Sequence, residues 1–76
     1  MINIELNLFA NLSQYLPANK QSYQVNENTN IEKVIQELGI PDDMVKLIFI
    51  NGKRVEKTHL LKQGDRLGVF PPVGGG

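Results

Sequence analysis

Few side chains in this sequence have the chemistry of a catalytic site. There is one histidine, His59, and no cysteine, which excludes a thiol nucleophile, iron–sulfur ligation and a cysteine-based zinc site. The neighbouring carboxylates Asp42 and Asp43 directly follow Pro41, a position typical of the beginning of a turn. Because no acid, base and nucleophile converge in this sequence, we expect no catalytic residue and no metal site. We place His59 at the surface or in a turn.

The last seven residues, FPPVGGG, form the most unusual segment of the chain. Proline fixes φ and removes backbone donors, whereas glycine adds chain entropy, so this segment favours neither helix nor sheet and contributes little to stability. On the residues alone, it is either a frayed end or a segment that another molecule recognises. We therefore divide the chain into a folded domain over residues 1–70 and an extended, flexible tail over residues 71–76.

Size and charge narrow the class of protein. The chain has 76 residues and a formal net charge of zero, which favours one domain and argues against a general nucleic-acid binder. No apolar run approaches the roughly 20 residues needed to span a bilayer, and the first residues lack the features of a signal peptide. We therefore expect a cytoplasmic protein that binds neither nucleic acid nor membrane.

The hydrophobic pattern predicts the elements that must hold the tail. Clean alternation predicts a strand over residues 2–9, and a shorter strand is expected over residues 22–25 after a long connection. The apolar stripe of Ile31, Val34, Ile35 and Leu38 predicts one helix. We expect a capping box of Thr29 and Glu32 at its start and Gly39 at its end.

Three further strands are predicted after the helix. Leu47–Ile50 is an apolar run, and Asn51-Gly52 after it is the commonest two-residue hairpin turn, with a short return over residues 53–55. A second turn, which Asp65 is expected to stabilise, leads into the last strand, Arg66–Phe70. The order indicates an α+β fold in which one helix packs on a mixed sheet of four to five strands.

The same alternation assigns the aromatic residues to one face of the sheet. If the leucines of the first and last strands point toward the helix, Phe9, Phe49 and Phe70 lie together on the uncovered face. Such a patch usually marks a surface for a partner, and Gly68 in mid-strand is consistent with close approach of another backbone. The alternatives are an inverted register in one strand, or a loop over residues 10–20 that covers the rings.

The segment QGDRLGVFPPVGGG resembles the end of the small subunit of molybdopterin synthase, in the MoaD/ThiS group of ubiquitin-like sulfur carriers. The segments Leu8-Phe9-Ala10 and INGKRV resemble the same family more weakly. The resemblance covers essentially the whole chain and implies a β-grasp fold, in which the first and last strands are parallel neighbours. The sequence departs from the family pattern at Gly74 and in a longer stretch between the first two strands.

The resemblance also implies a function for the tail. A ubiquitin-activating-type adenylyltransferase would use ATP to adenylate the carboxylate of Gly76, and a sulfur donor would convert it to a thiocarboxylate. The sulfur would then pass to a pterin precursor bound on the larger subunit of molybdopterin synthase, to form the molybdopterin dithiolene. That subunit would supply the catalytic residues, while the carrier binds no cofactor. Pro71 and Pro72 would extend the arm, and Val73, Gly74 and Gly75 would lead to its reactive end, since glycine leaves room for close approach.

From the alternation we predict that the partner interface consists of Phe70, Phe9, Phe49 and Gly68. The complex with the large subunit should depend on Phe9 and Phe70, because the parallel first and last strands of a β-grasp sheet bring both rings near the tail. Three other functions stay open. A ubiquitin-like modifier would be joined through Gly76 to lysines of target proteins, and a carrier could serve another pathway, such as thiamine synthesis. A plain interaction module would have no tail chemistry at all.

Overall fold

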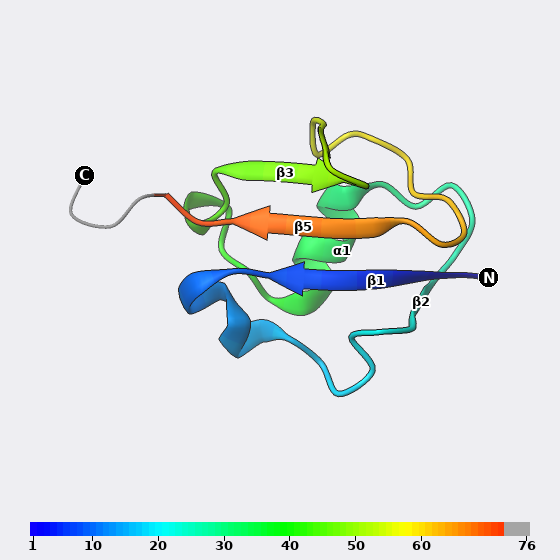
Figure 1. Ribbon diagram of the computed structural model, residues 1–76, viewed down its shortest axis with the longest axis horizontal. Coiled ribbons are helices and arrows are strands. Elements are labelled where there is room, and N and C mark those ends of the chain that lie inside the picture. Colours follow the sequence, from blue (N-terminus) through cyan, green and yellow to red (C-terminus); the bar gives the residue numbers. More distant parts are fainter. Residues whose placement is uncertain (73–76) are drawn as a thin grey trace.

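The structure, a computed structural model, describes residues 1–72. Its five strands form one mixed sheet in the order β2-β1-β5-β3-β4, and α1 lies across one face of it (Figure 1). The strands are β1 (Ile2–Leu8), β2 (Tyr23–Val25), β3 (Leu47–Ile50), β4 (Lys53–Arg54) and β5 (Arg66–Phe70). The helix α1 spans Ile31–Leu38, and two 3-10 turns, η1 (Ala10–Tyr15) and η2 (Asp42–Met44), lie in the connections. The predicted α+β architecture is confirmed.

The central strand of the sheet is β5, which carries the start of the terminal segment. It pairs in parallel with β1, where Leu6 lies opposite Leu67, and antiparallel with β3, where Leu47 lies opposite Phe70. The predicted parallel pairing of the first and last strands is thus confirmed. The predicted strand over residues 2–9 ends one residue earlier, at Leu8, although the Phe9 amide still donates to the Val69 carbonyl at 3.1 Å.

The core lies between the sheet and α1. Leu67 and Val69 of β5 are fully buried. The strand lies between β1 and β3 in the sheet, and both side chains belong to the core that the sheet forms with α1. The connections add apolar side chains to the same core, among them Leu12 of η1. The other buried apolar residues are Ile2, Ile4, Leu6, Leu8, Val25, Ile31, Val34, Ile35, Ile40, Ile48, Ile50 and Leu61. The pairing of β5 with a strand on each side, together with its two buried side chains, thus fixes its position in the domain.

The start of α1 differs from the prediction. The N-cap is Asn30, whose side-chain oxygen accepts a hydrogen bond from the Lys33 amide at 2.9 Å. Thr29 does not cap the helix, because its hydroxyl donates to the Asn26 carbonyl at 2.6 Å. The predicted Thr29–Glu32 capping box is therefore wrong. The chain stays extended through Asn30, which forms an isolated β-bridge with Leu60, and this long-range pairing delays the helix by one residue.

The strand predicted over residues 22–25 begins one residue later, at Tyr23, and the return predicted over residues 53–55 ends at Arg54. Three other local predictions are confirmed. Gly39 ends α1 with a φ of 79°, the left-handed conformation that favours glycine. Asn51 and Gly52 make the turn between β3 and β4 with φ angles of 52° and 85°. Asp65 stabilises the turn before β5, since its carboxylate accepts from the Lys62 amide at 2.9 Å. In residues 1–72, no helix has the length and apolar character needed to cross a membrane.

Candidate functional site

The three phenylalanines of the chain lie together on the face of the sheet that α1 leaves uncovered. The rings of Phe9 and Phe70 are stacked, with centroids 4.2 Å apart and planes 7° apart. Phe49 meets Phe70 edge to face at a centroid distance of 5.5 Å. We call Phe9, Phe49 and Phe70, together with Gly68, the aromatic patch. The predicted common face is confirmed.

Both alternatives to that assignment are wrong. The strand registers place Phe49 opposite Gly68, and Phe70 opposite Leu47, while the alternate residues of β1 and β5 are buried beneath α1. The loop over residues 10–20 does not cover the rings, because Phe9 keeps 41% of its surface exposed. Instead, η1 contributes Leu12 to the core. An apolar patch left open in this way is typical of a binding surface.

Gly68 provides the space in which Phe9 lies. A Cβ atom built on Gly68 would meet Cε2 of Phe9 at 3.5 Å and Cβ of Phe49 at 4.0 Å. The glycine was interpreted from the sequence as a place where another backbone approaches. In this chain the nearest group to that position is the ring of Phe9, so the absence of a Cβ atom at Gly68 serves packing within the chain.

An open hollow of 460 Å³ extends from the aromatic patch across the sheet. Its polar end carries Glu5 and Arg66, which lie opposite each other in the β1–β5 register. The side-chain amide of Asn7 donates a hydrogen bond to the Glu5 carboxylate at 3.1 Å, so these two neighbours on β1 are linked. These three polar residues were not singled out from the sequence. The alternation that found the phenylalanines places Glu5, Asn7 and Arg66 on the same face and is the signal that indicates them.

The terminal segment begins at the edge of the aromatic patch. Phe70 is the last residue of β5, and its carbonyl accepts a hydrogen bond from the Lys46 amide at 2.8 Å. In Figure 1, β5 and β1 run side by side and end at the same edge of the sheet. Pro71 is half-buried and Pro72 is exposed. The other predicted tail residues, Val73, Gly74, Gly75 and Gly76, lie outside the described residues.

The other ionisable residues do not assemble a catalytic centre. Asp42 and Asp43 are exposed and begin η2, as predicted. His59 is exposed, and its backbone carbonyl accepts from the Ile31 amide at 3.1 Å, which agrees with a surface or turn residue. Among residues 1–72, no three side chains of histidine, aspartate or glutamate come together as metal ligands.

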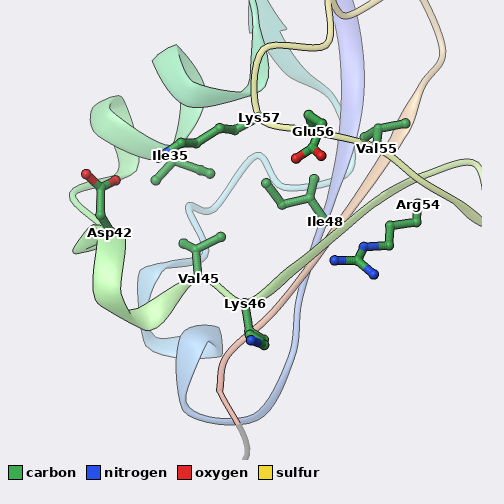
Figure 2. A pocket seen from close by; sticks show the side chains of 9 residues that line it. All are labelled: Ile35, Asp42, Val45, Lys46, Ile48, Arg54, Val55, Glu56 and Lys57. Atoms are coloured by element: carbon green, nitrogen blue, oxygen red, sulfur yellow. The ribbon is translucent and has the colours of Figure 1, made fainter.

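A second hollow, of 180 Å³, lies on the helix side of the sheet (Figure 2). Apolar side chains of α1 and β3, Ile35 and Ile48, contribute to its lining. Its charged residues carry both signs and come from separate segments: Asp42, Lys46, Arg54, Glu56 and Lys57. Lys57 is also engaged with Glu32 at 3.6 Å. This mixture shows no preference for one charged ligand, so the aromatic patch and the segment that leaves it form the better candidate site.

One tyrosine far from this site has an altered acidity. Partial burial raises the pKa of Tyr23, and the neighbouring Glu37 carboxylate, which accepts a hydrogen bond from the Tyr23 hydroxyl at 3.3 Å, raises it further. Tyr23 lies on β2 at the edge of the sheet, on the side of the helix rather than of the aromatic patch. Its ionisation therefore bears on stability and not on the candidate site.

Comparison of the sequence with protein families gives one match over nearly the whole chain. Residues 1–74 match the profile of a family described as "Mut7-C ubiquitin". No curated protein matches the sequence.

Solved structures resemble the fold closely despite low sequence identity. A putative molybdopterin converting factor, subunit 1, from Pyrococcus furiosus is 23% identical and superposes with a TM-score of 0.75, over 96% of this chain and 100% of that chain. SAMP1 from Haloferax volcanii is 19% identical with a TM-score of 0.70, over 97% of this chain and 99% of that one. The thiamine biosynthesis protein ThiS from Geobacter metallireducens is 18% identical with a TM-score of 0.65, over 99% of this chain and 100% of that one. These similarities confirm the predicted ubiquitin-like β-grasp fold and the predicted resemblance to MoaD/ThiS proteins.

Proposed function

The chain belongs to the Mut7-C ubiquitin family, and on that premise we propose that it is a sulfur carrier that works through the carboxylate of Gly76. The observation that carries the proposal is the segment Pro71-Pro72-Val73-Gly74-Gly75-Gly76, which follows directly on the central strand β5. The proposal requires that Gly76 bears a free carboxylate in the cell. Fold similarity to a molybdopterin converting factor subunit and to ThiS supports it.

The proposed chemistry proceeds in two displacements on a partner enzyme. A carboxylate oxygen of Gly76 attacks the α-phosphorus of ATP, and pyrophosphate leaves. Sulfide-level sulfur from a donor then attacks the acyl carbon as HS⁻, and the bond from that carbon to AMP breaks; AMP leaves, one proton is lost, and the chain ends in a thiocarboxylate. Glycine at the last positions suits these steps, because no Cβ atom hinders approach to the acyl carbon. Since the reaction consumes ATP, the proposal places the carrier in the cytoplasm.

The carrier itself contributes position rather than catalysis. Phe70 is held by the β3–β5 ladder and by the rings of Phe9 and Phe49, so the start of the arm has a fixed place on the domain. Pro71 and Pro72 favour an extended chain beyond it, which keeps the loss of chain entropy on docking low. We propose that the aromatic patch docks on the adenylyltransferase and on the sulfur-accepting enzyme, and that these partners supply every catalytic group.

The finer proposal is that the acceptor is the large subunit of molybdopterin synthase. The Pro-Pro-Val sequence before the glycines favours this acceptor over the enzymes of thiamine synthesis. The second candidate function is attachment of Gly76 to lysines of target proteins, and the ubiquitin-like fold that this chain shares with SAMP1 is compatible with it. The two functions share the adenylation step and differ in the group that attacks the adenylate.

The test uses the chain with a purified adenylyltransferase from the same cell. Exchange of radioactive pyrophosphate into ATP that depends on the chain, and fails when Gly76 is deleted, supports adenylation. Thiocarboxylated chain is then given to molybdopterin synthase large subunit with its pterin precursor and, in parallel, to a thiazole synthase. Sulfur transfer to the pterin alone supports the finer proposal. Transfer to the thiazole alone, or only isopeptide-linked products in cell extract, would overturn it.

A further inference from the structure

Asn51 is the only asparagine in the chain that is followed by glycine. In such a pair the backbone nitrogen of the glycine can attack Cγ of the asparagine side chain, because no Cβ atom on the glycine hinders the approach. A nitrogen–carbon bond forms, Nδ2 leaves as ammonia, and water then opens the resulting succinimide ring. The product is aspartate or isoaspartate, and water is the only co-reactant.

The fold holds both ends of the Asn51 side-chain amide. Its oxygen accepts a hydrogen bond from the Arg66 amide at 2.9 Å, and its nitrogen donates to Oδ1 of Asp65 at 3.0 Å. The backbone amide of Asn51 also donates to the Arg66 carbonyl at 3.0 Å. Asn51 therefore joins the end of β3 to the start of β5. The proposal below requires that the side chain give up its two side-chain hydrogen bonds before the Gly52 nitrogen attacks.

We propose that Asn51 is a site of spontaneous deamidation whose rate is set by opening of these hydrogen bonds, and whose product weakens the connection between β3 and β5. The β3–β4 turn is exposed, so water reaches the side chain as soon as the bonds open. Because local opening precedes the reaction, the folded chain should deamidate more slowly than the unfolded chain.

The consequence of the reaction follows from Asp65. An aspartate at position 51 would place an oxygen where Nδ2 now donates, 3.0 Å from Oδ1 of Asp65. The Asp65 side chain is only 7% exposed, and its other oxygen already accepts from the Lys62 amide. Lys53 and Lys62 line the adjacent hollow and offset part of the repulsion. Two carboxylates this close together are destabilising even so, because neither has a proton to donate and Asp65 is buried.

The first test follows the unmodified protein in time. The chain is incubated at physiological pH and temperature, folded and in urea above its unfolding midpoint, and isoaspartate at position 51 is measured by peptide mapping. In urea we expect Asn51 to be modified ahead of every other asparagine. In the folded chain we expect the rate at Asn51 to fall by about tenfold or more. Equal rates in the two conditions, or no modification in urea, would overturn the proposal.

The second test measures the consequence with variants. Asn51→Asp should lower the urea midpoint of unfolding, whereas Asn28→Asp should leave it unchanged. Asn28 is the matched control because it is exposed and has a positive φ of 66°, and threonine follows it. The double variant N51D/D65N restores a donor opposite the new carboxylate and should regain most of the midpoint. If N51D matches the Asn28 control, or if the double variant is as weak as N51D, the proposed consequence is wrong.

Discussion

Replacement of Phe70 by alanine separates the packing role that this residue has in the structure from the docking role that we propose for it. Phe70 is half-buried at the end of β5, stacked on Phe9 at 4.2 Å and in edge contact with Phe49 at 5.5 Å. The core side chains that hold β5, Leu67 and Val69, are fully buried and do not depend on the ring. The variant should therefore fold, with less stability, and dock poorly.

The magnitudes of the two effects can be worked out separately. Loss of two aromatic pairs, at ~0.5–1.5 kcal/mol each beyond burial, lowers the free energy of unfolding by about 1–3 kcal/mol. This is less than the ~5–15 kcal/mol that is typical of folded domains. At the centre of an interface, truncation of an aromatic anchor costs about 2 kcal/mol or more of binding free energy. That corresponds to a Kd raised roughly thirtyfold.

The assay is a titration of the variant into the adenylyltransferase by isothermal calorimetry, below the melting temperature that circular dichroism gives for the same sample. Phe70→Leu serves as a milder variant, since it keeps an apolar side chain on β5. Leu60→Ala is the matched control, because Leu60 is another large apolar residue, 50% exposed, that does not line the hollow beside the patch. A Kd for Phe70→Ala equal to that of the Leu60 control would refute the docking role of the patch.

Four further substitutions test the fold. Leu67→Ala removes a fully buried side chain of β5 and should lower the free energy of unfolding, measured by urea denaturation, by about 2–5 kcal/mol. A decrease no larger than that caused by truncating an exposed residue would contradict the assigned core. Asn30→Ala removes the helix cap and should lower the free energy of unfolding by about 1 kcal/mol. A larger decrease for Thr29→Ala than for Asn30→Ala would show that Thr29 is the cap. Tyr23 has a raised pKa in the folded chain, so the unfolded chain loses its proton first and stability falls as pH rises through 10.0. Tyr23→Phe should lose less stability over that range than the unmodified chain, and an identical decline would show that Tyr23 is not responsible.

The sequence pattern predicted most of the fold because the pattern is local. Alternation along β1 and β5 identifies their buried faces, and the apolar stripe of α1 identifies the side of the sheet that it covers. Once those faces are known, the common face of Phe9, Phe49 and Phe70 follows from the period of a strand. The strand order follows from the resemblance of the terminal segment to a known family, and not from the pattern itself.

The errors and omissions arise from contacts between distant residues. Thr29 and Glu32 have the spacing of a capping box, but Asn30 caps the helix because the segment around Leu60 pairs with it. The role of Asn51 as a bridge to Arg66 could not be predicted from the Asn-Gly signal, which describes only the turn. The packing of the Phe9 ring over Gly68 depends in the same way on the register between β1 and β5.

The central claim is that Gly76 carries sulfur, and intact-protein mass spectrometry tests it most directly. The chain is incubated with the adenylyltransferase, ATP and a sulfur donor, beside a variant that lacks Gly76 and a reaction without ATP. The account predicts a mass gain equal to replacement of one oxygen by sulfur, confined to the last residue and absent from both controls. An unchanged mass, with an adenylyltransferase that is active on its own known carrier, would contradict the account.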